Sequence, residues 1–158
     1  MSVEIEQIGS GFDDFPSLLE LIRLSFAYMD GVVDPPSSAR SLTIDSLRAK
    51  TEGEIALMAR DETGILGCAF LRPEATSLYI GKLAILPAAQ GRGIGWGLLR
   101  EAEVVARQLG LPALRLETRI ELTDNQQRFA RWGFVKTAEN RHAGFDRTTS
   151  IEMQKLLL

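Results

Sequence analysis

Cysteine and histidine are almost absent from this chain, which holds one of each among its 158 residues. The single cysteine, Cys68, cannot form an internal disulfide, and the sequence indicates no base that would activate it as a nucleophile. It lies in an apolar stretch, so we predict that it packs in the core. Because histidine and cysteine form no cluster, no metal site is expected.

A surplus of positive charge is also lacking, because 18 lysines and arginines face 21 aspartates and glutamates, which gives a formal charge of -3. This balance offers no broad electrostatic surface for nucleic acid, and it suits cationic amine substrates only weakly. The N-terminus has no basic start followed by an apolar run, and no stretch reaches the length of a membrane span. We therefore expect a cytoplasmic protein that binds neither nucleic acid nor membrane.

The length suits one domain with a sizeable core, and we treat residues 1–158 as that domain. Hydrophobic periodicity and turn signals predict the elements, with residues 31–41 as a loop. The expected strands cover residues 3–8, 54–60, 65–71, 77–86, 114–118 and 150–155, with one more strand before the last. The expected helices cover residues 14–28, 43–50 and 94–109, with another that begins near residue 123. This order predicts an α/β fold of the mixed α+β type, a mixed sheet flanked by helices.

The most informative stretch is a glycine-rich turn between a predicted strand and a predicted helix, Gln90-Gly91-Arg92-Gly93-Ile94-Gly95. Glycines let backbone amides turn toward a ligand, and the helix that begins there adds unpaired amides and the positive end of its dipole. An apolar stripe supports this helix, and Gly110 ends it. The stripe consists of Ile94, Leu98, Ala102, Val105, Ala106 and Leu109. The turn therefore predicts a cradle for an anionic ligand that carries phosphate.

Two common phosphate-binding motifs do not fit this turn. A P-loop requires Gly-Lys-Ser or Gly-Lys-Thr at its end, and neither follows these glycines. The dinucleotide fingerprint Gly-x-Gly-x-x-Gly would need glycine at Trp96 or at Leu98, depending on the register. Taken alone, the motif is equally compatible with a glycine turn that binds nothing.

The same residues resemble a known family. A strand, Pro87, the glycine turn that begins at Gln90 and a helix are similar to the acyl-coenzyme A signature Arg/Gln-x-x-Gly-x-Gly/Ala of the GNAT-superfamily N-acetyltransferases. The segment from Asn125 to Phe134 resembles the family's Asn-x-x-x-Tyr-x-x-x-Gly-Phe motif. The specific motifs lie within residues 83–134, and the order of elements agrees over almost the whole chain. The resemblance implies a mixed, mostly antiparallel sheet whose parted strands bind acyl-coenzyme A.

The resemblance also implies where acetyl-coenzyme A, the cosubstrate, would bind. Amides of the glycine turn would hold its pyrophosphate, with Arg92 adding charge, and the backbone of residues 83–85 would pair with its pantetheine arm like an added strand. One of those amides would polarise the thioester carbonyl. The side chains of residues 83–85 are equally those of a buried strand, and Asn125 equally begins a helix. The implied cofactor-binding residues are Leu83, Ala84, Ile85, Gln90, Gly91, Arg92, Gly93, Ile94, Gly95, Asn125 and Phe129.

The catalytic groups are less clear from the sequence. The family often places a tyrosine four residues before the Gly-Phe glycine, but Phe129 stands there and cannot donate a proton. The thiolate then leaves unassisted, as a thiol pKa of about 8.5 allows, or another group protonates it. An amine with a pKa of about 10.4 must also lose a proton before it attacks. Glu117 is the first candidate base, with pairing to Arg115 on the same strand face as its structural alternative, and Tyr79 is the second.

The acceptor pocket is expected across the parted strands from coenzyme A, bounded by the loop after the first helix. Its expected wall residues are Tyr28, Asp30, Ser37 and Ser38. Asp30 and Asp34 would attract a cation if they faced this pocket. His142, the only histidine, falls in a loop between the last strands, where we expect it to face solvent. Trp96 and Trp132 are expected to pack rather than to bind substrate.

Three hypotheses of function follow. The first is an N-acetyltransferase that moves the acetyl group of acetyl-coenzyme A to a primary amine by direct attack. The second is a non-catalytic acyl-coenzyme A binding or regulatory module, for which Phe129 is the reason. The third is a generic nucleotide-phosphate binder, which the failed motif counts disfavour. The acceptor would be a small molecule or a peptide, and the protein a monomer or a homodimer.

Overall fold

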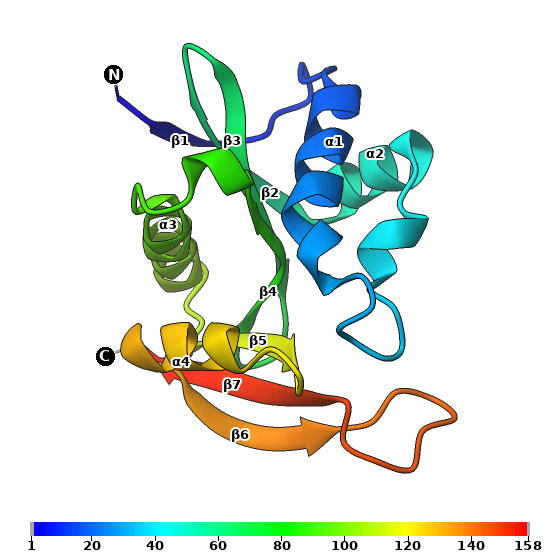
Figure 1. The fold of residues 1–158 in the computed structure, drawn as a ribbon. Coiled ribbons are helices and arrows are strands. Elements are labelled where there is room, and N and C mark those ends of the chain that lie inside the picture. The colour runs from blue at the N-terminus through cyan, green and yellow to red at the C-terminus, as the bar shows by residue number, and fades with distance from the viewer. Residues whose placement is uncertain (1, 158) are drawn as a thin grey trace.

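A computed structural model describes residues 2–157, which form a seven-stranded sheet with helices on both faces (Figure 1). The strand order is β1-β2-β3-β4-β5-β7-β6, and neighbouring strands are antiparallel except for β4 and β5, which run parallel. The strands are β1 (Glu4–Gln7), β2 (Ile55–Asp61), β3 (Gly64–Pro73), β4 (Leu78–Ile85), β5 (Ala113–Arg119), β6 (Val135–Asn140) and β7 (Ser150–Leu156). The predicted mixed, mostly antiparallel sheet is confirmed.

Helices lie on both faces of the sheet. The α1 and α2 helices cover one face and α3 covers the other, while α4 follows β5 (Figure 1). Their bounds are α1 (Phe15–Phe26), α2 (Ile44–Gly53), α3 (Ile94–Gln108) and α4 (Thr123–Arg131). Short 3-10 helices cover Ala27–Met29, Ser38–Ser41 and Pro87–Ala89, and the second of these falls in the predicted loop. Within residues 2–157, no helix is long and apolar enough to cross a membrane.

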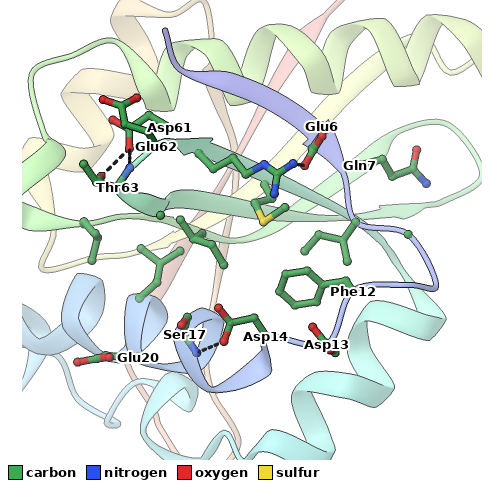
Figure 2. Close-up of a pocket in the computed structure, with 18 of the residues that line it drawn as sticks. Glu6, Gln7, Phe12, Asp13, Asp14, Ser17, Glu20, Asp61, Glu62 and Thr63 are labelled. Carbon is green, nitrogen blue, oxygen red and sulfur yellow. Dashed lines mark hydrogen bonds and ion pairs between the residues drawn. The ribbon is translucent and has the colours of Figure 1, made fainter. Parts of the chain in front are cut away.

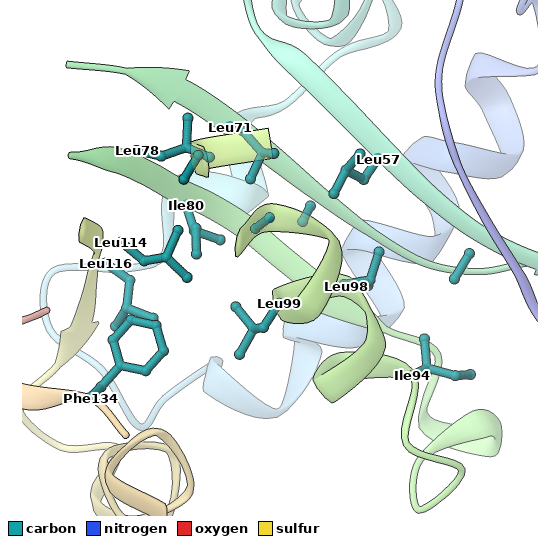
Figure 3. Close-up of a cluster of buried hydrophobic side chains, with 14 of the residues drawn as sticks. Leu57, Leu71, Leu78, Ile80, Ile94, Leu98, Leu99, Leu114, Leu116 and Phe134 are labelled. Carbon is teal, nitrogen blue, oxygen red and sulfur yellow. The ribbon is translucent and has the colours of Figure 1, made fainter. Parts of the chain in front are cut away.

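Alternation along the strands divides the core between the two faces. In β2, Ala56 and Met58 pack with α1 and α2, whereas Leu57 and Ala59 belong to the core that contains α3. Figure 3 shows this second core, in which leucines of α3 meet apolar side chains of the sheet. Cys68 lies in the first core, where burial raises the pKa of its thiol to about 12. The predicted packing role of this cysteine is therefore confirmed.

The helices begin where the sequence indicates, but α1 ends at Phe26 rather than at residue 28, and α2 continues to Gly53 rather than ending near residue 50. Asp14 caps α1 by accepting a hydrogen bond of 3.3 Å from the amide three residues later, and Thr43 forms a capping box with Ser46 at the start of α2. Gly110 follows α3 with a φ of 73°. The predicted stripe was wrong for Leu109, which is 49% exposed. The reason is that α3 ends at the preceding residue, so this side chain lies beyond the turns that pack on the sheet.

The pairing of β4 with β5 is short. Only Leu78 with Leu114 and Tyr79 with Arg115 are in register, although both strands continue for several residues. The strands therefore separate toward their C-terminal ends, as the family resemblance implied. The backbone of β4 that faces the resulting gap does not pair with β5.

A β-bulge lies in β4 beside this gap. Cys68 of β3 faces Ala84 and Phe70 faces Gly81, so two residues of β4 stand opposite one residue of β3. Lys82 lies in the bulge with a φ of 48°, a value that is uncommon for a residue with a side chain. The bulge and the short pairing together set the shape of the site described next.

Candidate functional site

A cavity of about 470 Å³, which we name the turn cavity, opens beside the glycine turn. It is lined by β4, the glycine turn, the first turn of α3 and one side of α4. Of the residues from Gln90 to Trp96, all except Arg92 line it. The glycine turn predicted from the sequence as an anion cradle therefore forms one wall of an actual cavity.

The backbone at this wall presents unpaired amides. Gly91 and Gly93 have φ values of 84° and 78°, which residues with a Cβ atom rarely adopt. The first hydrogen bond of α3 runs over 3.0 Å from the amide of Gly97 to the carbonyl of Gly93. The amides of residues 94–96 consequently have no partner within the helix. Together with the helix dipole, they make this wall suitable for a pyrophosphate.

The arginine of the glycine turn points elsewhere. Arg92 forms an ion pair of 3.4 Å with Asp61, whose side chain is almost fully buried. Hydrogen bonds from Thr63 and the guanidinium of Arg92 hold the pKa of Asp61 below its usual value. The turn cavity instead contains Arg128, which is its only arginine among the described residues. Sequence reasoning missed Arg128, although it lies one helical turn after Asn125 and therefore on the same face of α4.

The edge of β4 that faces the gap is set by its hydrogen bonds. The amide of Leu86 donates to a β3 carbonyl at 2.9 Å, whereas the amide of Ile85 donates to the hydroxyl of Ser25 in α1 at 3.1 Å. Successive residues of a strand direct their backbone groups to opposite edges, so Leu83 and Ile85 face the gap. Ala84 turns its backbone toward β3, and its side chain is fully buried. The geometry does not support its expected contact with a cofactor.

Aromatic side chains form the floor of the turn cavity. The ring of Trp132 lies 5.9 Å from that of Phe129 and 5.8 Å from that of Trp96, between ring centroids. A Cβ atom at Gly95 would lie 3.4 Å from the ring of Trp132, so this glycine also permits close packing. The expected packing role is confirmed for Trp132, which packs against the core that contains α3, whereas Trp96 is 37% exposed; both line the cavity.

A second cavity of about 360 Å³, which we name the gap cavity, lies between the separated parts of β4 and β5. The loop after α1 and the loop between β6 and β7 complete its walls. Five residues line both cavities, so the two meet. These residues are Phe26, Tyr28, Leu83, Asn125 and Phe129. At this junction the side-chain amide of Asn125 donates a hydrogen bond of 3.0 Å to the hydroxyl of Tyr28.

The gap cavity brings together most of the residues expected at the acceptor site. Those that line it are Tyr28, Ser37, Ser38, Tyr79 and Glu117. Asp30 does not line it, because its carboxylate points toward Arg40 at 3.7 Å. Asp34 does not line it either and pairs with Arg147 at 3.3 Å. The two loop carboxylates that could have attracted a cation therefore lie outside the cavity.

Glu117 is held at the edge of a larger ionic network. Its carboxylate accepts a hydrogen bond of 2.9 Å from the side-chain amide of Asn140 and lies 3.9 Å from the guanidinium of Arg115. Arg115 is closer to Glu74 and Glu152, at 2.9 and 3.2 Å. The expected pairing within the strand is present, but one arginine serves three carboxylates, and Glu117 is the most distant of them.

Tyr79 is unsuited to accept a proton. The guanidinium groups of Arg72 and Arg115 lie 4.7 and 4.5 Å from the centre of its ring. Burial, followed by the charge of Glu117, raises the pKa of Tyr79 above its usual value. The phenol is therefore protonated near neutral pH, and the geometry does not support Tyr79 as a base.

His142 does not face solvent, so that expectation was wrong. Its ring is half-buried in the wall of the gap cavity, and its Nδ1 atom shares a short hydrogen bond with the hydroxyl of Thr149. Thr149 is fully buried, which anchors this loop against the sheet. Burial, followed by the charge of Arg119, lowers the pKa of His142. The neutral imidazole is therefore the main form near neutral pH.

Sequence reasoning also missed two cations of the gap cavity, Lys82 and Arg119. The ammonium of Lys82 donates to the hydroxyl of Ser38, and the guanidinium of Arg119 donates to the carbonyls of Pro35 and Pro36. A charged residue inside the apolar run of β4 was the available signal for Lys82. For Arg119 the sequence held none, because its partners are backbone atoms more than eighty residues away.

The comparison with known families agrees with this geometry. A family model described as "Acetyltransferase (GNAT) family" matches residues 15–134, which include both sequence motifs and the five residues that line both cavities. This chain belongs to the GNAT acetyltransferase family. Proteins of this family transfer acyl groups with acetyl-coenzyme A as cosubstrate. The family resemblance noted in the sequence is therefore confirmed, and so is the cosubstrate.

Solved structures share the fold of this GNAT protein. The PaiA N-acetyltransferase of Thermoplasma acidophilum, in complex with coenzyme A, has a TM-score of 0.80 at 20% identity, over 99% of this chain and 100% of that one. The ribosomal-protein-S18-alanine N-acetyltransferase of Escherichia coli has a TM-score of 0.74 at 16% identity, over 98% and 94%. A GNAT family acetyltransferase of Elizabethkingia anophelis with acetyl-CoA bound has 0.70 at 20%, over 98% of both chains. No curated protein matches the sequence.

A third concavity of this GNAT protein, of about 970 Å³, lies between the start of α1 and the β2–β3 hairpin. Figure 2 shows that acidic side chains surround it, among them Glu6, Asp13, Asp14 and Asp61. It contains neither the glycine turn nor any residue of β5. The ion pair between Asp61 and Arg92 connects it to the glycine turn, but within residues 2–157 no residue lines both it and the turn cavity, so we do not include it in the candidate site.

Proposed function

We propose that this GNAT protein is an N-acetyltransferase that moves the acetyl group of acetyl-coenzyme A to a primary amine by direct attack. One observation carries the proposal. The turn cavity and the gap cavity meet at Leu83 and Phe129, where β4 and β5 separate. A donor bound in the first cavity and an amine bound in the second would therefore approach each other at the end of the donor's pantetheine arm.

The donor side fits acetyl-coenzyme A. The free amides at the start of α3 and the guanidinium of Arg128 would bind the pyrophosphate. The backbone of Leu83 and Ile85 would pair with the pantetheine arm, and one of these amides would stabilise the negative charge that develops on the thioester oxygen. The amide of Ile85 already has a partner in Ser25. We propose that this hydroxyl occupies the position that a group of the pantetheine arm takes when the cosubstrate binds.

Glu117 is the proposed base of the acceptor side. It lines the gap cavity and is the only carboxylate that does so among the described residues. Its neighbour His142 is neutral near pH 7 and can take up a proton from it or from the amine. We no longer propose Tyr79 for this role, because its phenol keeps its proton. It remains available as a hydrogen-bond donor to the acceptor.

Tyr28 is the proposed source of a proton for the leaving thiolate. Phe129 of α4 stands where the family often has a tyrosine. Tyr28 lines both cavities, however, and its hydroxyl accepts a hydrogen bond from Asn125, which also belongs to α4. A phenol that reaches the junction from the loop after α1 could do the work of the missing one. We expect Tyr28→Phe to lower kcat for thiol release with little change in the KM for acetyl-coenzyme A.

The proposal is tested by transfer from acetyl-coenzyme A to a panel of primary amines, with the released thiol measured and the N-acetyl product identified by mass spectrometry. Ser41→Ala serves as the matched control for Tyr28→Phe, because Ser41 lies in the same region of chain outside both cavities. Product that depends on the amine and falls with Glu117→Gln supports the proposal. Release of thiol without any acetylated amine contradicts it.

A non-catalytic acyl-coenzyme A binding module is the second candidate, and Phe129 is the observation that favours it. The two functions differ in one measurement. A binding module would take up acetyl-coenzyme A and return it unchanged in the presence of every amine of the panel. An enzyme would consume it, and it would do so more slowly after Tyr28→Phe.

A further inference from the structure

The gap cavity carries an unequal charge. Among the described residues that line it, Lys82 and Arg119 are cations, Glu117 is the one carboxylate, and the single histidine is neutral. The protein as a whole is acidic, with a formal charge of -3. A cavity with surplus positive charge in an acidic protein is unsuited to a simple polycation.

Neither cation has a carboxylate partner. The ammonium of Lys82 bonds a hydroxyl and lies 6.0 Å from the ring of Phe26, and the guanidinium of Arg119 bonds two backbone carbonyls. No ion pair joins either residue to an acidic side chain within the part of the chain that the structure describes. Asp34 and Glu121, the two carboxylates whose charges act on the pKa of Arg119, are engaged by Arg147 at 3.3 and 3.9 Å.

The surroundings of Lys82 add to this surplus. Burial and the charges of Lys50 and Arg119 lower its pKa, while Glu54, the acidic group that opposes them, pairs with Lys50 at 2.7 Å. Partly buried cations that lack counter-ions are costly unless a ligand neutralises them. This side of the cavity therefore favours an anionic group.

The opposite charge gathers around Glu117. Its network holds three carboxylates, from Glu74, Glu117 and Glu152, against two guanidinium groups, because Arg115 contacts all three carboxylates and Arg72 pairs with Glu74 alone at 3.7 Å. This network begins where β4 and β5 pair, whereas Lys82 and Arg119 lie farther along the separating strands. The cavity consequently has a negative end and a positive end.

From this arrangement we infer that the acceptor is an amino acid or a similar small amine that also carries a carboxylate. Its carboxylate binds Lys82 and Arg119, and its amino group lies toward Glu117. A volume of about 360 Å³ accommodates a molecule of this size. The inference rests on the proposed function, since it names the acceptor class of the same site.

The test compares amines that differ only in the acid group. Each amino acid is paired with its carboxamide and with its decarboxylated amine, and kcat/KM is measured for each by acetyl transfer and mass spectrometry. We expect the acid to exceed both partners by at least about tenfold, because a charge-assisted hydrogen bond contributes on that scale. A carboxamide or decarboxylated amine that equals or exceeds its acid overturns the inference and leaves the proposed function intact.

Variants identify the groups that read the carboxylate. Lys82→Met should raise KM for the acids about tenfold and leave KM for the carboxamides unchanged, and Lys82→Arg should restore most of the difference. Lys136→Met is the matched control, because Lys136 is paired with Glu139 on β6 and does not line the cavity. Equal losses for acids and carboxamides in Lys82→Met would overturn the assignment.

Two further outcomes are decisive. If no amine of either class is acetylated although the protein binds acetyl-coenzyme A, the proposed function fails and the inference fails with it. If only peptides with an acidic first residue are acetylated, free amino acids are excluded as acceptors and the inference is overturned in that form.

Discussion

Gly93 offers a direct way to test the anion-binding wall. It stands immediately before α3 with a φ of 78°, and a Cβ atom built on it would meet nothing within 4 Å. Two substitutions fit this open space equally well, Gly93→Glu and Gly93→Gln. They share the cost of a side chain in the left-handed conformation, about 1–2 kcal/mol, and differ only in one negative charge.

The size of the difference follows from electrostatics. A glutamate at this position would lie beside the amides of residues 94–96, where we propose that the pyrophosphate binds, and we take a charge separation of about 7 Å. Two unit charges at about 7 Å interact by about 2.4 kcal/mol at an effective dielectric constant of about 20. This repulsion corresponds to about 50-fold in affinity. We therefore expect Gly93→Glu to bind coenzyme A about 50-fold more weakly than Gly93→Gln.

Calorimetric titration with coenzyme A measures this ratio of affinities, and a second titration in about 0.5 M salt tests whether the ratio is electrostatic in origin. Screening by salt should bring the two variants closer together, since the difference between them is electrostatic. ATP and NAD serve as control ligands, which we expect to bind weakly to all three proteins. Equal affinities of the two variants for coenzyme A would refute the placement of the pyrophosphate at the start of α3.

Three other predictions concern stability and charge. Arg128→Gln should weaken coenzyme A binding by about tenfold, whereas Arg131→Gln, on the same helix but outside the cavity, should not; equal effects would contradict the assignment. Ser25→Ala leaves the amide of Ile85 without its partner, so the free energy of unfolding should fall by about 1–3 kcal/mol and the melting temperature with it. Coenzyme A should restore part of this loss, and an unchanged melting temperature would contradict the prediction. Hydrogen bonds from Arg115 lower the pKa of Glu74 in the folded state. The stability that this pair provides is therefore fully present above pH 4.5, the usual pKa, and is lost as the pH falls through the lower pKa of the folded state. Chemical denaturation should show a smaller loss in acid for Arg115→Met, and an unchanged pH profile would exclude this pair as a cause.

Most of the fold could be predicted from the sequence, because its elements carry local signals. The apolar runs at residues 54–60 and 65–71 and the helix starts near Asp14 and Thr43 each depend on a few neighbouring residues, and the structure agrees with them. The 3-10 helix Ser38–Ser41 was missed, since a single turn of this kind leaves no periodic pattern. The strand order was also not predicted from local signals, because it depends on contacts between distant segments.

The site could be predicted only where the backbone is the functional group. The glycine turn was found because Gly91 and Gly93 mark it directly, but the direction of Arg92 depends on Asp61, thirty-one residues away. His142 was misplaced for the same reason, as its anchor is the buried Thr149 of the next strand. Side chains whose roles depend on distant partners are the ones that sequence reasoning missed or misassigned.

The bulge in β4 has a consequence for how this site can vary. Since Lys82 adds one residue opposite β3, Leu83 and Ile85 present their backbone to the gap and Ala84 does not. Without the bulge, the backbone of Ala84 would face the gap and the backbones of Leu83 and Ile85 would face β3. The side chains of Leu83 and Ile85 would then also point to the opposite face of the sheet. The strand edge that we propose for the pantetheine arm is thus set by how many residues of β4 lie between its pairings at Gly81 and Ala84, rather than by the side chains of those residues. Substitution can change those side chains while the edge stays the same, whereas a shift of one residue in the pairing would lose the edge and the core together.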